Sequence, residues 1–210
     1  MSIKAIRNII FDLGGVILNI NPQLTVDAFR ELGWNDFYDK GNLSISKSLF
    51  YNLESGSSTP ATFRNNVRHM IAKQIKDNEI DMAWSAMILD IPADRIRYLE
   101  ELKKSYRVFL LSNTNEIHRI KFHREFEADF GYSFYDLFER NFYSHEMGMR
   151  KPNPEIYLQA LKEADLDPVE TLFIDDMEEN IEAARTIGMK GLHIQPGTLL
   201  EMLPGFLKDY

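Results

Sequence analysis

The stretch IIFDLGGVI, residues 9–17, decides the fold because a short apolar run ends abruptly in an aspartate and a pair of glycines. Ile9–Phe11 are continuously apolar, which is typical of a parallel strand that is buried on both faces. Asp12 comes directly after this strand. Gly14 and Gly15 leave room for backbone N–H groups to approach a ligand closely. We therefore expect Asp12 to lie at a ligand-binding edge of a sheet.

Further along the chain, similar apolar runs alternate with helical stripes. Three more runs are predicted to be buried strands: Val108–Leu111, Leu172–Ile174 and Leu192–Ile194. Apolar residues at helical spacing occur at 96–102, 156–164 and 183–187. This alternation predicts an α/β fold with a doubly wound, mostly parallel sheet. Ligands of such sheets bind beyond the carboxyl ends of the strands.

Residues 20–91 interrupt this pattern, because they contain helix-like segments and no convincing buried strand. Thr59 and Pro60 are typical of a helix start, with Thr59 as the N-cap and Pro60 at the first helical position. An insertion that follows the first strand lies above the ligand-binding edge, where a lid would be placed. We therefore expect a helical cap at 20–91 and an α/β core at 1–19 and 92–210.

The composition narrows the classes of partner. The 210 residues carry a net charge of −8, which argues against nucleic acid and anionic membranes, since both favour clustered Lys and Arg. No apolar run approaches the roughly 20 residues that span a bilayer, and cysteine is absent. We expect a cytoplasmic protein with a small-molecule partner. The sequence does not predict its oligomeric state.

Polar residues follow the later strands in a pattern that suits phosphoryl transfer. That reaction needs an in-line nucleophile, cations that offset the phosphoryl charge and donors around its oxygens. Asp12 and Asp176, with help from Asp175, are suited to hold a hard cation such as Mg²⁺. Ser112 has a hydroxyl to donate to the phosphoryl group, and Lys151 supplies a positive charge.

The segments IIFDLGGVI, LLSNTN, GMRKP and FIDDMEENI resemble the four motifs of the haloacid dehalogenase-like (HAD) hydrolases, in the order of that family. The resemblance covers nearly the whole chain and implies a Rossmann-like core with an inserted cap. It also implies a magnesium-dependent phosphatase in which Asp12 is the nucleophile and forms an aspartyl-phosphate. Ser112 and Lys151 would bind the phosphoryl group as the other catalytic residues.

The resemblance also assigns a metal site and a phosphate site. Asp12, Asp176 and the backbone carbonyl of Gly14 would ligate Mg²⁺, while Asp175 would mainly hold metal-bound water. The combination DLGG, SNTNxxH and GMRKP resembles a subgroup that includes bacterial α-D-glucose 1-phosphate phosphatases, so a small phosphorylated metabolite, first of all a sugar 1-phosphate, is the expected substrate. The expected phosphate- or substrate-binding residues are Gly14, Gly15, Ser112, Asn113, Asn115, His118 and Lys151.

One position departs from the family pattern. Most HAD phosphatases have a second aspartate two residues after the nucleophile, where this chain has Gly14. That aspartate is the general acid, and such a group is typically worth about 10²–10⁴ in rate. Three interpretations remain open: His118 supplies the proton, the substrate carries a good leaving group such as an anomeric oxygen, or turnover has been lost.

Two alternative functions follow. The first is a 2-haloacid dehalogenase, which uses the same aspartate without a metal, so the acidic pair weighs against it. The second is a non-catalytic protein of HAD fold that binds a phosphate ligand. Two of the site residues also have an alternative structural interpretation, because Asn113 and Asp176 could each cap the helix that follows.

Overall fold

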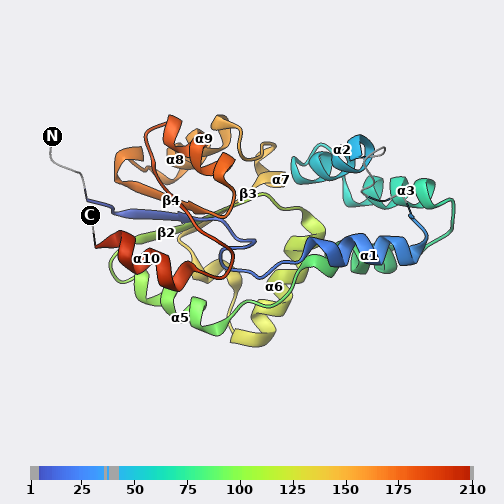
Figure 1. Cartoon of the computed structure of the whole chain (residues 1–210), viewed down its shortest axis with the longest axis horizontal. Helices are drawn as coiled ribbons and strands as arrows, with labels where there is room; N and C mark the ends of the chain where they lie inside the picture. Colours follow the sequence, from blue (N-terminus) through green and yellow to red (C-terminus); the bar gives the residue numbers. More distant parts are fainter. Residues whose placement is uncertain (1–4, 36, 38–42, 209–210) are drawn as a thin grey trace.

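The computed structural model describes residues 5–35, 37 and 43–208 (Figure 1). One parallel sheet forms its centre, with the strand order β3-β2-β1-β4-β5. The strands are β1 (Asn8–Phe11), β2 (Arg107–Ser112), β3 (Arg140–Tyr143), β4 (Thr171–Asp175) and β5 (Lys190–His193). The α-helices are α1 (Pro22–Leu32), α2 (Leu43–Glu54), α3 (Pro60–Ile71), α4 (Asp77–Trp84), α5 (Ala93–Leu102), α6 (Glu116–Phe130), α7 (Ser144–Met147), α8 (Pro154–Ala164), α9 (Glu178–Thr186) and α10 (Leu199–Leu207). Short 3₁₀ helices are η1 (Ser85–Met87), η2 (Phe134–Leu137) and η3 (Pro168–Glu170).

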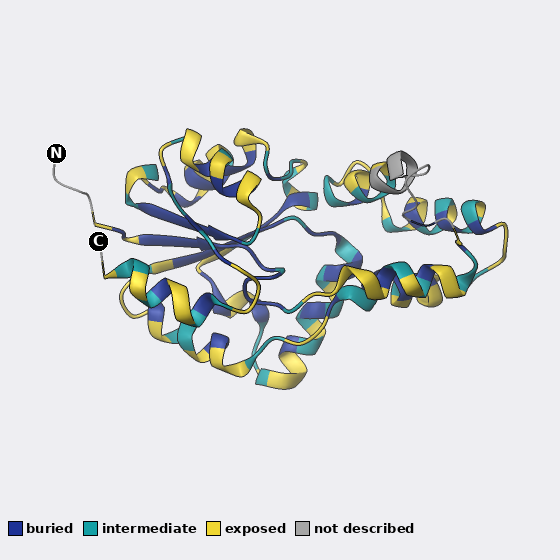
Figure 2. Ribbon diagram, viewed as in Figure 1, coloured by how far each residue is buried: buried dark blue, intermediate teal, exposed yellow. Residues whose placement is uncertain are grey.

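The strand β1 lies at the centre of the sheet and is covered on both faces. Ile9 and Phe11 pack in one apolar cluster with α5, α6 and α10, whereas Ile10 packs in a second cluster with α8 and α9. Figure 2 shows the strands as a buried layer between these two groups of helices. Burial on both faces explains why the strand sequences are continuously apolar and do not alternate.

The register of the sheet brings the polar strand ends together. Phe11 pairs with Leu110 of β2 and with Ile174 of β4, and all of these strands are parallel. The next residue of β1, Asp12, therefore comes level with the carboxyl ends of both neighbouring strands.

The doubly wound α/β class is confirmed, but the edge strand β3 was not predicted from the sequence. Within the described residues it pairs only with β2, and only its last two residues, Phe142 and Tyr143, are buried. Because Arg140 and Asn141 occupy its first half, the strand has no continuous apolar run that would predict it.

The helices α1–α4 project beyond the carboxyl ends of the strands (Figure 1). They surround their own apolar core, in which Phe29, Phe63 and Trp84 are nearly inaccessible to solvent. The start of α3 is confirmed, because Thr59 accepts a hydrogen bond from the amide of Thr62. A separate core and this position above the sheet support our proposal that residues 20–91 act as a cap.

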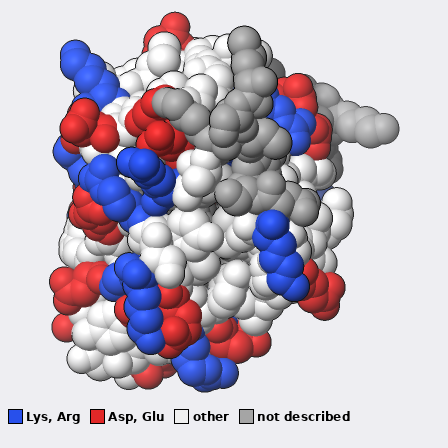
Figure 3. Space-filling model, turned by 90° about the vertical axis from the view of Figure 1, so that its left-hand side faces the viewer, with Lys and Arg blue, Asp and Glu red and all other residues white. Residues whose placement is uncertain are grey.

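The surface shows no strong segregation of charge on the face in Figure 3, where acidic and basic side chains are interspersed. Among the described residues, no helix is long and apolar enough to cross a membrane.

Candidate active site

A buried lysine joins two strand ends at the centre of the site. Lys151 Nζ lies 2.7 Å from Asp12 Oδ1 and 2.7 Å from Asp175 Oδ2. The lysine side chain is 1% exposed, so its charge is offset mainly by these carboxylates and hardly by water. Charges taken this far from solvent are tolerated only when they are paired and hydrogen-bonded. The residues predicted to be the nucleophile and the phosphate-binding cation are therefore in direct contact.

Asn113 fixes the segment that carries this lysine. Its side chain accepts a hydrogen bond from the amide of Lys151 and donates one to the carbonyl of Lys151, both at 2.9 Å. Asn113 follows Ser112, the last residue of β2, and both line the cavity above the sheet. The structure thus gives the side chain of Asn113 a positioning role for Lys151.

Three carboxylates form a cluster suited to a metal ion. Asp12, Asp175 and Asp176 each offer an oxygen, and these oxygens lie within 4.8 Å of one another. Ligands of one Mg²⁺, each about 2.1 Å from the ion, lie at most about 4 Å apart, so the cluster fits the ion after a small inward movement. An all-oxygen donor set is the one that Mg²⁺ prefers.

Burial and mutual repulsion alter how these acids titrate. Burial raises the pKa of Asp12 and Lys151 lowers it, while the negative charges of Asp175 and Asp176 raise it; together these effects bring it to about 7. Burial and Asp175 also raise the pKa of Asp176. The carboxylates raise the pKa of Lys151 despite its burial. A bound cation would favour the ionised form of the nucleophile in the same way as Lys151 does.

The hydrogen bonds of Asp175 hold it in place. Its Oδ1 accepts the amide of Met177 at 2.8 Å, and Asn180 Nδ2 lies 3.0 Å from both of its oxygens. Asn180 was missed in the sequence, where its only signal is its position one turn into α9 behind the acidic pair. With one oxygen held by Lys151, Asp175 is suited to orient its neighbours, and its role in holding metal-bound water stays a prediction.

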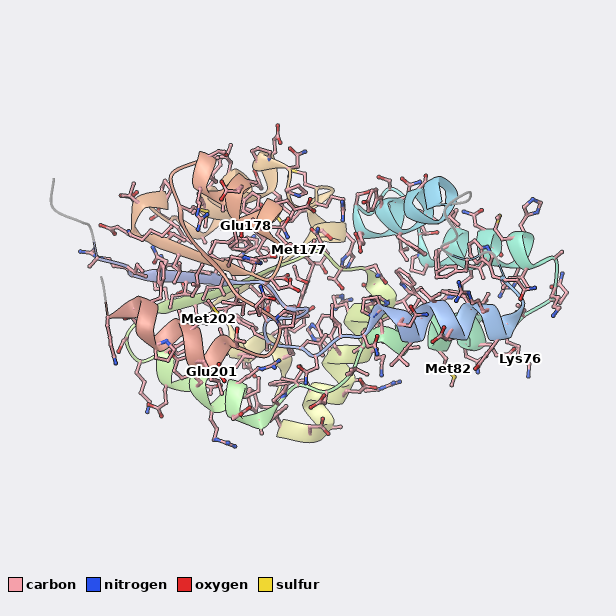
Figure 4. The ribbon with its side chains drawn as sticks, in the orientation of Figure 1. Lys76, Met82, Met177, Glu178, Glu201 and Met202 are labelled. Carbon is pink, nitrogen blue, oxygen red and sulfur yellow. The ribbon has the colours of Figure 1, made fainter. Side chains whose placement is uncertain are left out.

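The helix-capping alternatives for Asn113 and Asp176 are wrong. The N-cap of α6 is Asn115, whose Oδ1 accepts the amide of His118. The N-cap of α9 is Met177, whose amide is bound by Asp175. Met177 lies at the end of the core that faces the cap (Figure 4).

Two glycines allow close approaches at the first motif. Gly15 has a φ of +77°, and a Cβ there would lie 2.3 Å from Asp176 Oδ2. Any side chain at position 15 would therefore displace a metal-ligand candidate. A Cβ at Gly14 would lie 3.3 Å from Ile20 Cδ1, so Ile20 occupies space next to the position where related enzymes carry their acid.

Asn115 and His118 contact the cap. Asn115 is completely buried and accepts a hydrogen bond from Trp84 Nε1 at 3.2 Å. His118 stacks on the Trp84 ring, with centroids 4.7 Å apart, and its Nε2 lies 3.0 Å from the Trp84 carbonyl. Burial lowers the pKa of His118 to about 4, so it is neutral near pH 7 and poorly suited to donate a proton. Both residues hold the end of α4, and substrate binding by them stays a prediction.

A cavity of about 550 Å³ lies between the sheet and the cap. Of the predicted site residues, it is lined by Asp12, Gly14, Ser112, Asn113, His118, Lys151 and Asp176. Gly15, Asn115 and Asp175 lie outside this lining. Three lining residues that the sequence analysis missed are Glu54, Arg150 and Asn180; Arg150 stands next to Lys151 in the GMRKP segment.

Known proteins of similar sequence share one family. The family model described as haloacid dehalogenase-like hydrolase matches residues 6–188. A D-ribitol-5-phosphate phosphatase from Bacteroides thetaiotaomicron is 31% identical over 91% of this chain and 93% of its own. A sesquiterpene phosphatase from Aspergillus oryzae is 32% identical over 88% of each chain.

Solved structures give the same result. A crystal structure of a HAD family enzyme from Bacteroides thetaiotaomicron in complex with magnesium superposes with a TM-score of 0.89, at 35% identity over 95% of this chain and 98% of that chain. An L-2-haloacid dehalogenase structure superposes with a TM-score of 0.61 at 18% identity, covering 91% of this chain and 86% of its own. The second similarity concerns the fold alone.

Proposed function

Because the chain belongs to the haloacid dehalogenase-like hydrolases and is a phosphatase, we propose that it hydrolyses a small phosphorylated metabolite through an aspartyl-phosphate on Asp12, with Mg²⁺ as the cofactor. The observation that carries this proposal is the contact between Asp12 and the buried Lys151, beside the cluster with Asp175 and Asp176. It supports the proposal because a buried cation and three carboxylates lie together at one edge of the sheet.

The residues of the chain suit the two halves of the reaction. A carboxylate oxygen of Asp12 attacks phosphorus, and the bond from phosphorus to the ester oxygen breaks. Lys151 neutralises charge on the phosphoryl oxygens, and the hydroxyl of Ser112 donates a hydrogen bond to one of them. Water then attacks phosphorus, and the bond to Asp12 breaks, which releases phosphate. Preorganised charges of this kind usually supply most of the stabilisation of a phosphoryl transition state.

The acidic cluster would hold the magnesium ion through Asp12 and Asp176, with the carbonyl of Gly14 as a further ligand. When bound, the ion supplies positive charge between the carboxylate nucleophile and the phosphate dianion, which would otherwise repel each other. Asp175 contributes by orientation, because its own oxygens are already hydrogen-bonded to Lys151, Asn180 and the amide of Met177.

The substrate class is supported by the cavity and by the relatives. A cavity of about 550 Å³ has the volume of a site for a small metabolite. The relative named for D-ribitol 5-phosphate favours a sugar or sugar-alcohol phosphate, within which a sugar 1-phosphate remains our expectation from sequence. Dehalogenation is disfavoured, because the acidic cluster has no use in a metal-free reaction.

Release of inorganic phosphate from a panel of esters tests this proposal. The panel includes sugar 1-phosphates, D-ribitol 5-phosphate and acyl phosphates, each assayed with Mg²⁺ and with a chelator. We expect turnover of at least one sugar or sugar-alcohol phosphate, and its loss in the chelator. Haloacid turnover without Mg²⁺ and no phosphate release would contradict the proposal.

A further inference from the structure

A cap carboxylate reaches the cavity above the nucleophile. Glu54, the last residue of α2, lines the same cavity as Asp12 and Asp176. Its Oε2 lies 3.0 Å from Arg150 Nη2, and its side chain is 21% exposed. Arg150 in turn lies over the Tyr51 ring, 4.0 Å from its centroid. Arg150 of the core is therefore held by two side chains of α2, the carboxylate and the aromatic ring.

The docking of α2 on the core is tight beside this residue. Figure 1 shows α2 next to α7, and these two helices are in contact. A Cβ at Gly56 would lie 2.2 Å from the carbonyl oxygen of His145, so the chain that follows Glu54 approaches the core backbone more closely than any other residue type permits. The position of Glu54 over the cavity is thus fixed by contacts that form when the cap is docked.

Among the acidic residues of the cavity lining, Glu54 is the one with no other role in the proposed reaction. The carboxyl groups that line it within the described part of the chain are Asp12, Glu54 and Asp176. Asp12 is the nucleophile and Asp176 the metal-ligand candidate. His118 is neutral and occupied by the carbonyl of Trp84. Position 14, where related enzymes carry an acid, has no side chain.

The electrostatic surroundings suit a group that changes its protonation state. Burial raises the pKa of Glu54, and this effect outweighs the opposing charges of Arg150 and Lys151. Tyr51 lies one turn earlier on the same helix, and the backbone of His145 on α7 faces Gly56, two residues after Glu54. A general acid works best when its pKa lies near the working pH.

We propose that Glu54 is the general acid and base of the reaction and takes the place of the carboxyl group that is missing at Gly14. This proposal rests on the phosphatase function proposed above. In the first step the Glu54 carboxyl gives its proton to the ester oxygen as the bond to phosphorus breaks, so a neutral alcohol leaves. In the second step the Glu54 carboxylate takes a proton from water. At the same time the water oxygen bonds to phosphorus and the bond from phosphorus to Asp12 breaks. Arg150 pairs with this carboxylate and holds α2 against the core.

The test compares two aromatic esters that differ in leaving group. 4-Nitrophenolate leaves without a proton, whereas the alkoxide of benzyl phosphate needs one. We expect Glu54→Gln to lower kcat/KM for benzyl phosphate by about 10²–10⁴ and for 4-nitrophenyl phosphate by less than about tenfold. The ratio of the two values is independent of the concentration of folded enzyme, so partial misfolding of the variant does not alter it. Glu54→Asp, which keeps the carboxyl group, should recover part of the benzyl phosphate activity.

A second variant separates proton transfer from cap docking. Arg150→Gln removes the same ion pair but keeps the carboxyl group of Glu54. We therefore expect it to lower kcat/KM by a similar factor for both esters. If Glu54→Gln also lowers kcat/KM equally for both esters, or lowers it for neither, Glu54 is not the acid and the proposal is overturned. The panel of sugar, sugar-alcohol and acyl phosphates tests the phosphatase function separately, and no phosphate release from any ester in Mg²⁺ would refute both that function and the role of Glu54. Wild-type activity with an unchanged ratio in Glu54→Gln refutes the acid alone.

Discussion

Replacing Lys151 with Gln should lower the free energy of unfolding far more than the same replacement of an exposed lysine. The substitution removes the positive charge between Asp12 and Asp175, whose buried carboxylates each lie 2.7 Å from Nζ. Removing one partner of a buried ion pair typically costs about 3–5 kcal/mol, because the remaining charge stays buried and unpaired. For a chain of this length that corresponds to a fall in Tm of about 10 °C.

The matched control is Lys104→Gln. Lys104 makes an ion pair of the same length, 2.7 Å, with Glu101, but both side chains are about two-thirds exposed. Such a pair is worth about 0–1 kcal/mol. Urea unfolding in a chelator at pH 8 measures both variants. We also expect the deficit of Lys151→Gln to shrink as the pH falls towards 6, because the loss of Lys151 raises the pKa of Asp12 further and the folded state then binds the proton. An equal loss of unfolding free energy in the two variants would refute the argument from burial.

Two further predictions concern His118 and Gly15. Since burial lowers the pKa of His118 to about 4 from 6.5, the unfolded state binds the proton first. The wild type should therefore lose about 3 kcal/mol of stability between pH 7.5 and pH 4 that His118→Phe does not lose; identical pH profiles in urea unfolding would contradict this. Gly15→Ala should weaken Mg²⁺ binding in calorimetry at least tenfold, because the new methyl group meets Asp176, whereas Gly131→Ala, at a φ of +78° with open space around it, should cost only about 1–2 kcal/mol of stability. Equal Mg²⁺ affinity in both glycine variants would show that Asp176 is not a ligand.

The sequence predicted the sheet well where burial is complete on both faces. The strands β1, β2 and β4 each contain a continuous apolar run that is followed directly by polar residues, so their type and their carboxyl ends could be recognised. The edge strand β3 could not, because one side of it is unpaired and its first half is polar. Its absence from the prediction changed no conclusion about the site, since the predicted site residues follow other strands or precede α8.

The site was predictable in part, for a physical reason. Residues that act through their position at a strand end, such as Asp12 and Ser112, are fixed by local sequence and sheet register. Asn115 and His118 follow β2, as Ser112 does, but their partner is Trp84. Because Trp84 belongs to the cap, local sequence pattern does not predict its position. Glu54 was missed for the same reason, because its place above the cavity depends on how α2 docks against Arg150.

The most direct test of the central claim is phosphate release by Asp12→Asn. The variant keeps the shape of the side chain and removes the attacking carboxylate, so with saturating Mg²⁺ and 4-nitrophenyl phosphate its kcat should fall at least about 10³-fold, as for the loss of a nucleophile that splits one difficult step in two. Circular dichroism checks that the fold is retained. Wild-type activity of folded Asp12→Asn protein would show that another group attacks phosphorus and would contradict the account.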